Sequence, residues 1–247
     1  QFIAYENELY VIEVNPRSSR TVPYISKISG MPVIEIATKV ILGQTLEETG
    51  YKPGIYKKPN LVAVKVPVFS TEKLGDVEVS LGPEMRSTGE VLGVGNTIDE
   101  AIYKGLLAGK RVNKVSDKNI LLTIRDKDKE EFLPIAKELI DLNCKLFATA
   151  GTAKFLQENN VEASKINRIG ENSPNILTAI QNKDIDLIIN TPTKANDAQR
   201  DGFKMRRTAI EYGVEVLTCF DTLNAIIKTE KKHFKDKELD IFDISKI

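Results

Sequence analysis

The first twenty residues place oxygen-bearing and basic side chains close together at the end of an expected β-strand. In ELYVIEVNPR, the period-2 alternation of a strand turns one face from apolar to oxygen-bearing at Glu13 and Asn15. Arg17 and Arg20 follow directly, and their guanidinium groups suit phosphate oxygens. Carboxylate and amide oxygens beside arginines indicate a site that binds a metal ion and a phosphate.

The geometry of this site depends on how the strand pairs with the residues before it. We expect a hairpin with residues 6–8 as a three-residue loop, which sets Gln1 opposite Glu13. Gln1, Glu13 and Asn15 then offer only oxygen ligands, the preference of Mg²⁺, with nucleotide phosphates completing the shell. A two-residue loop would set Gln1 against Ile12 and reverse its face. The simpler alternative is a half-exposed strand whose polar side chains meet water.

A second group of polar side chains follows the expected strands of the carboxyl-terminal half. Thr149 and Thr152 bracket the start of a helix, where they either cap it or join its backbone N–H groups in binding an anion. Asn190 ends another strand, and Lys129 and Arg168 lie just beyond two more. Open α/β sheets bind ligands at the carboxyl ends of their strands, so these side chains should converge. The set holds no histidine, cysteine nucleophile or carboxylate pair, which favours holding a phosphate over moving a proton.

Five short apolar or β-branched runs, each followed by a helical stretch, indicate the fold of residues 118–247. Such β-then-α repeats are typical of a parallel sheet covered by helices on both faces, a doubly wound α/β fold. Ser173-Pro174 is expected to cap the helix Asn175–Asn182. The strand runs are residues 120–124, 145–148, 163–166, 185–189 and 214–217.

The amino-terminal part mixes helices and strands, as an α+β domain does. Arg111–Lys118 is polar and without apolar period, so we expect a first domain over 1–110, a linker over 111–117 and a second domain over 118–247. The first two helices should pack behind the Glu13 site. The expected elements are a helix from Pro23 to Gly30, a helix from Pro32 to Gly43, a strand over Leu61–Phe69, and a helix to Ala108 whose cap Thr97 forms a capping box with Glu100.

Composition limits the classes of function. The 35 basic residues balance the 35 acidic ones, so no global field draws nucleic acid or an anionic membrane. No apolar run is long enough to span a bilayer. Cys144 and Cys219 give neither a disulfide framework nor a zinc spacing, which favours the reducing cytosol. His233, in a charge-rich run, and Arg206 with Arg207 are interpreted as solvated charge, although the arginines could reach a phosphate.

The motif around Glu13 resembles a known family. IEVNPRSSRTVPYISKISGMP and LGPEMRSTGEVLGVG are similar to the carbamoyl-phosphate synthetase large subunit, the first of them to the end of an ATP-grasp domain. The resemblance implies that Gln1, Glu13 and Asn15 bind Mg²⁺ or Mn²⁺. It also implies that Gln1 and Glu13 contact ATP, a substrate, and that Arg17 is a catalytic residue near its phosphates.

Residues 118–247 resemble the methylglyoxal-synthase-like regulatory domain that ends the same large subunit, a likeness carried by ATAGTA and IINTPT. The positions that hold a nucleotide effector such as UMP or IMP in the family match five residues of this chain. Arg168 stands where lysine is common, and Pro192 stands where many relatives have a hydroxyl. The five residues are Lys129, Thr149, Thr152, Arg168 and Asn190.

The resemblance implies the carboxyl-terminal part of a ligase that makes carbamoyl phosphate from bicarbonate, glutamine-derived ammonia and two ATP, for pyrimidine and arginine synthesis. Its expected partner is a glutaminase subunit in a cytoplasmic oligomer of heterodimers. Since Gln1 falls within a strand, we expect a fragment that is inactive alone, because the lysine-bearing ATP cradle is missing. One alternative is a free-standing nucleotide-binding regulatory module without catalysis. A free-standing methylglyoxal synthase is disfavoured, since the sequence lacks a GGDQQ-like run and a suitably placed histidine.

Overall fold

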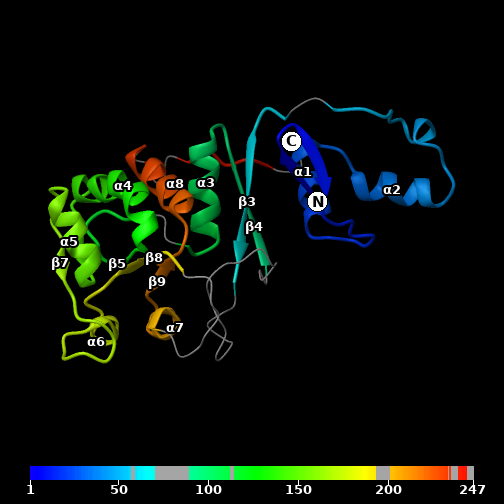
Figure 1. Ribbon diagram of the computed structural model, residues 1–247. Coiled ribbons are helices and arrows are strands. Elements are labelled where there is room, and N and C mark those ends of the chain that lie inside the picture. The colour runs from blue at the N-terminus through cyan, green and yellow to red at the C-terminus, as the bar shows by residue number, and fades with distance from the viewer. Residues whose placement is uncertain are drawn as a thin grey trace. The chain divides into compact units, whose positions relative to one another are not determined.

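The computed structural model describes residues 1–56, 59–69, 89–111, 114–192, 201–232, 234 and 239–243. The chain forms two compact units, Gln1–Leu61 with Ile241–Ile247, and Val62–Asp240, and Figure 1 traces their elements. The expected linker at 111–117 falls inside the second unit, and the division into two family domains on either side of it stays a prediction. His233 and the first part of LGPEMRSTGEVLGVG lie outside the described residues.

The first unit opens with a β-hairpin whose register differs from the prediction. β1 (Phe2–Tyr5) pairs antiparallel with β2 (Glu8–Val11), and the strand ends Tyr5 and Glu8 face each other. The loop therefore has two residues, and the predicted three-residue loop is wrong. Both loop residues have positive φ, 49° and 64°, the mirror-image turn whose twist matches that of hairpin strands.

Two short helices follow the hairpin, close to where the sequence places them. α1 spans Thr21–Ser29 and ends at Gly30, whose φ of 65° is the left-handed conformation that glycine adopts at helix ends. α2 spans Val33–Ile41, and a 3₁₀ turn follows at Glu47–Thr49. No described residue of this unit is buried, so the predicted packing of both helices behind the Glu13 site is wrong for this structure. Apolar side chains of α2, among them Ile41, are exposed.

The second unit is built on the predicted parallel sheet. Its five strands lie in the order β7-β6-β5-β8-β9, and every neighbouring pair is parallel. Side chains alternate between the two faces, so Ile120 and Leu122 of β5 point into one core cluster and Leu121 into the other. The strands are β5 (Asn119–Thr123), β6 (Lys145–Ala148), β7 (Ser164–Lys165), β8 (Leu187–Asn190) and β9 (Glu215–Leu217).

Helices cover both faces of this sheet, as Figure 1 shows. The larger core cluster lies under α4 (Lys129–Asp141), α5 (Ala150–Glu158) and α8 (Phe220–Lys231). The smaller cluster lies under α6 (Ile176–Gln181) and α7 (Asp201–Glu211). The doubly wound α/β prediction is thereby confirmed.

The cap of α6 differs from the prediction. Asn175, not Ser173, is the N-cap: its side chain accepts hydrogen bonds from the backbone N–H groups of Leu177 and Thr178. The Thr178 hydroxyl in turn accepts from the N–H of Asn175 at 2.9 Å, which completes a reciprocal capping box. An asparagine one residue beyond the proline therefore caps this helix, so Pro174 lies outside it.

A β-hairpin with its own helix joins the larger core. β3 (Val62–Val68) pairs antiparallel with β4 (Gly89–Gly95), and α3 (Ile98–Ala108) packs on both. Thr97 caps α3 as predicted, by accepting from the N–H of Glu100 at 3.2 Å. The Glu100 carboxylate accepts from the N–H of Asn96, one residue before the position that a capping box requires. Glycines of β4 let α3 approach the strand closely.

Candidate functional site

The amino-terminal candidate site brings two of its three predicted metal ligands together. The Asn15 amide donates to the Glu13 carboxylate at 3.0 Å, so the two polar side chains lie side by side beyond the end of β2. The observed register sets Gln1 opposite Ile12, on the face away from Glu13, and the predicted three-ligand set is not assembled. Arg17 is exposed and donates to the backbone carbonyl of the residue that follows it. Among the described residues, no three His, Cys, Asp or Glu side chains form a metal-binding group.

The second candidate site lies at the carboxyl edge of the parallel sheet, and Lys129 is its best-defined residue. Lys129 begins α4, and its ammonium group donates to the carbonyl of Gly151 at 2.9 Å, in the first turn of α5. Its side chain is 12% exposed and lies 5.8 Å above the ring of Phe155. A Cβ added to Gly151 would lie 3.7 Å from the ammonium nitrogen, an ordinary contact distance, which again places the ammonium beside the start of α5.

The first turn of α5 carries the two predicted threonines. Thr149 is its N-cap, with an extended backbone and no side-chain capping bond. Thr152 is buried, and its hydroxyl donates to the carbonyl of Ile124, just after β5. The first N–H groups of any helix have no acceptor within it, and the helix dipole adds positive potential there. The Lys129 ammonium therefore lies against the first turn of α5, at the helix end whose positive potential favours an anion.

Asn190 ends β8 inside a buried network. Its amide nitrogen donates to the hydroxyl of Thr123 at 2.7 Å, and its amide oxygen accepts from the guanidinium of Arg206 at 2.7 Å. Asn190 and Arg206 are each 6% exposed. The interpretation of Arg206 as solvated charge is therefore wrong, because its side chain packs under the sheet edge. Arg207 does lie in a surface pair, with its guanidinium 2.9 Å from Glu211.

The remaining predicted residue, Arg168, is exposed beyond β7, the edge strand of the sheet. Its backbone N–H donates to the carboxylate of Glu171 at 2.8 Å, which shapes the loop that carries it. The structure therefore ties Lys129 to the first turn of α5 by a direct contact and places Asn190 and Arg168 on the same edge of the sheet.

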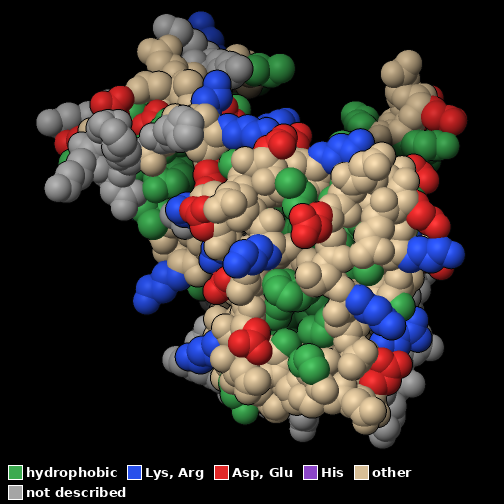
Figure 2. Space-filling model, turned by 90° about the vertical axis from the view of Figure 1, so that its left-hand side faces the viewer, with side chains coloured by type: hydrophobic (Ala, Val, Ile, Leu, Met, Phe, Trp, Pro, Cys, Tyr) green, Lys and Arg blue, Asp and Glu red, His purple; other side chains and the backbone are tan. Residues whose placement is uncertain are grey.

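Sequence reasoning missed two residues at this edge. Asp126 lies 2.6 Å from the Lys129 ammonium, and the hydrogen bond and charge of that ammonium lower the pKa of its carboxyl group. Thr123 anchors the Asn190 amide. The i, i+3 spacing of Asp126 and Lys129 on a helical turn was the available signal for the first. Figure 2 shows acidic and basic side chains intermingled over one face of the molecule, in keeping with the zero net charge.

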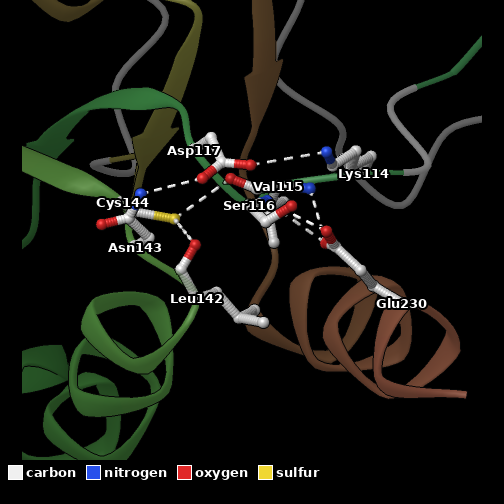
Figure 3. Close-up of polar contacts among 8 residues, drawn as sticks. All are labelled: Lys114, Val115, Ser116, Asp117, Leu142, Asn143, Cys144 and Glu230. Carbon is white, nitrogen blue, oxygen red and sulfur yellow. Dashed lines mark hydrogen bonds and ion pairs between the residues drawn. The ribbon is translucent and has the colours of Figure 1, made fainter. Parts of the chain in front are cut away.

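At the opposite, amino edge of the sheet, a carboxylate holds the segment that enters β5. Figure 3 shows Glu230 of α8 directed at this segment, where it accepts from the N–H of Val115 at 2.7 Å and of Ser116 at 3.2 Å. The Cys144 thiol donates to the Val115 carbonyl at 3.0 Å. These contacts hold the segment that enters β5 at the edge of the sheet opposite Lys129.

Two family models match the chain, one for each candidate site. Residues 1–49 match the carbamoyl-phosphate synthase L chain, ATP binding domain, and residues 131–218 match the MGS-like domain. Carbamoyl phosphate synthase large chains from Clostridium perfringens (strain 13 / Type A) and Clostridium botulinum (strain Loch Maree / Type A3) are each 56% identical to 99% of this chain. Over nearly all of its own length, the chain is thus similar to carbamoyl phosphate synthase large chains. It spans 23% of the length of those two relatives.

The family matches cover most of the predicted site residues. The ATP-binding-domain match contains Gln1, Glu13, Asn15 and Arg17, while Lys129 lies two residues before the MGS-like match that contains the other four effector-site candidates. Among solved structures, a methylglyoxal synthase from Elizabethkingia anophelis NUHP1 aligns with 44% of this chain and 76% of its own at 20% identity and a TM-score of 0.37, which is too distant to argue from. No helix in the described part of the chain is long and apolar enough to cross a membrane.

Proposed function

We propose that this chain is part of an enzyme that makes carbamoyl phosphate from bicarbonate, glutamine-derived ammonia and two ATP, for pyrimidine and arginine synthesis. The support is the order of the two family matches along one chain, at 56% identity to the Clostridium perfringens relative throughout. In this proposal a glutaminase subunit supplies ammonia, and the assembly is a cytoplasmic oligomer of heterodimers. The free thiols of Cys144 and Cys219 accord with that reducing compartment.

For the amino-terminal site, we propose that Glu13 and Asn15 hold Mg²⁺ or Mn²⁺, that Gln1 and Glu13 contact ATP, and that Arg17 lies beside its phosphates. The adjacent carboxylate and amide are the oxygen donors that a hard cation takes. A bound divalent cation would screen the phosphate charge of ATP. Gln1 would join as a third ligand only with its side chain on the face of Glu13. Paramagnetic Mn²⁺ should broaden the amide signals of residues 13–15, and unbroadened signals would contradict this site.

For the carboxyl edge of the sheet, we propose a regulatory site for a nucleoside monophosphate such as UMP or IMP. The observation that carries this proposal is the Lys129 ammonium held against the first turn of α5. In the proposal the nucleotide phosphate binds between Lys129, Thr149 and Thr152, with Arg168 and Asn190 at the flanks. A helix start contributes about 0.3 to 1 kcal/mol to an exposed anion, and a hydrogen bond to a charged group about 1.5 to 3 kcal/mol. Affinity on the order of micromolar follows after the cost of immobilising the ligand.

Calorimetry with the 247-residue chain tests this site. UMP or IMP should bind with a measurable heat, and Thr149→Ala combined with Lys129→Ala should remove it. Lys145→Ala is the matched control, because Lys145 is an exposed lysine that begins β6 at the opposite edge of the sheet. Binding by the double variant as tight as by the parent would place the effector elsewhere.

A free-standing regulatory module without catalysis is the second candidate. The observation in its favour is that every buried side chain of the described residues belongs to the second unit. The two proposals predict the same nucleotide binding and differ in the context of the chain. Carbamoyl phosphate synthesis by the protein that carries this chain, lost on Glu13→Gln, would decide for the enzyme.

A further inference from the structure

The ammonium group of Lys129 already has an ion-pair partner within this chain, the carboxylate of Asp126. An ammonium group has three N–H donors. The Gly151 carbonyl takes one at 2.9 Å, and the carboxylate of Asp126 takes another at 2.6 Å. Since the Gly151 carbonyl belongs to α5, it cannot leave without unwinding the helix, whereas a side chain can rotate away. The Asp126 contact is therefore the one that an incoming anion can exchange.

We propose that Asp126 is a built-in competitor for the phosphate group at Lys129, so that its carboxylate sets the affinity of the site. The proposal rests on the nucleotide site proposed above. It adds a residue that makes binding weaker rather than stronger.

The surroundings of Asp126 fit this role. Its side chain is 96% exposed and lies on the one-turn 3₁₀ helix Asp126–Asp128 ahead of α4. The other two charged side chains of this turn lie elsewhere. Asp128 forms an ion pair with Arg125, and Lys127 is exposed to solvent. The lowered pKa of the Asp126 carboxyl, caused first by its hydrogen bond to Lys129, keeps it charged at neutral pH. Because the carboxylate side of this pair is open to solvent, water can replace the Lys129 contact when Asp126 rotates away.

A phosphate that binds at Lys129 must therefore displace Asp126 or lie beside it. Removing the carboxylate ends both its repulsion of the phosphate and its hold on the Lys129 ammonium. Phosphate binding should therefore tighten roughly threefold to tenfold. The gain should shrink as salt is added, because salt screens exposed charges.

Calorimetric titration of the full 247-residue chain with UMP and with inorganic phosphate tests the proposal. Asp126→Asn should tighten the binding of both probes roughly threefold to tenfold, since both carry the phosphate group. Asp126→Glu, which keeps a carboxylate within reach of Lys129, should stay within about twofold of the parent. Asp184→Asn removes an equal charge from an exposed aspartate just before β8, at the amino edge, and should change nothing.

The outcomes separate this proposal from the nucleotide site itself. If the parent binds UMP and Asp126→Asn binds it no more tightly, the competitor role is wrong and the nucleotide site stands. If the Asn and Glu variants tighten binding equally, the effect is not one of charge and the role is again wrong. If neither parent nor variants bind either probe, both proposals fail. Binding that is detectable only in Asp126→Asn would support both.

Discussion

The two cysteines show how strongly position within the fold sets the chemistry of one residue type. Cys144 is 5% exposed, and its thiol donates to the Val115 carbonyl (Figure 3). Burial raises the pKa of the Cys144 thiol to about 11, and the charges of Glu230 and Asp117 act in the same direction. Cys219 is exposed just before α8. Only a thiolate is a good nucleophile, so the two thiols should differ in reactivity.

Alkylation with iodoacetamide at pH 8 should modify Cys219 rapidly and leave Cys144 untouched in the folded chain. Both should react in urea, which controls for intrinsic reactivity. Mass spectrometry of the peptides reads out each site. Equal labelling of Cys144 and Cys219 without denaturant would show that Cys144 is not enclosed as the structure has it.

The raised pKa of Cys144 also predicts a pH dependence of stability. Because the folded state holds this proton more tightly than the unfolded chain, the contribution is complete below the ordinary thiol value of 9.0 and is lost as pH rises through about 11. The free energy of unfolding, measured with urea, should fall less between pH 8 and pH 10.5 in Cys144→Ala than in the parent. The matched variant Cys219→Ala should lose as much as the parent, and an equal loss in all three proteins would contradict the assignment.

At the scale of elements, close contact between β4 and α3 depends on glycine. A Cβ added to Gly93 would lie 1.9 Å from the carbonyl oxygen of Ala101 and 2.6 Å from the backbone nitrogen of Gly105. Both are backbone atoms, so the helix itself would have to move. In the same strand, a Cβ on Gly89 would meet Val68 at an ordinary 3.6 Å.

Gly93→Ala should therefore destabilise the chain by about 3 kcal/mol or more, as overpacking against backbone does in its severe cases. Gly89→Ala should stay within about 0.5 kcal/mol of the parent. Chemical denaturation followed by circular dichroism measures both. Unchanged stability in Gly93→Ala would mean that α3 does not pack on β4 as closely as described.

The elements also show where sequence reasoning succeeds and why it stops. The five strands of the parallel sheet were predictable to within about two residues, because strands that are buried on both faces consist of continuous apolar, β-branched residues. The hairpin register was not, since the two-residue loop needs Glu6 at positive φ and the sequence carries no glycine there to signal it. Similarly, the N-cap of α6 was misplaced because Ser173 and Asn175 are both good capping residues.

In the candidate sites, too, some features could be predicted from the sequence and others could not. Alternation along a strand predicted that Glu13 and Asn15 share a face, and they are hydrogen-bonded. The burial of Arg206 could not be predicted, because it depends on Asn190, sixteen positions away in sequence on β8. A charged residue in a polar helix is solvated unless a distant partner encloses it, and one sequence does not reveal that partner.

At the scale of the whole molecule, the two compact units differ in how they are stabilised. Val62–Asp240 holds both hydrophobic core clusters, whereas Gln1–Leu61 holds no buried described residue. The chain spans 23% of the length of its Clostridium perfringens relative. The proposed regulatory site lies wholly within the unit that has its own core, so it can be tested on this chain alone.

Titration of the ¹⁵N-labelled chain with UMP and IMP, followed by backbone amide shifts, tests whether a nucleotide phosphate binds at Lys129. Saturable shifts are expected at the carboxyl edge, at Gly151, Thr152 and the residues around Lys129, with no shift at Asn143 and Cys144 on the amino edge. Because the chain remains unaltered, a failure to fold cannot mimic the negative result. Saturable shifts confined to other residues, or no shifts with either nucleotide, would contradict a phosphate site at Lys129 and the first turn of α5.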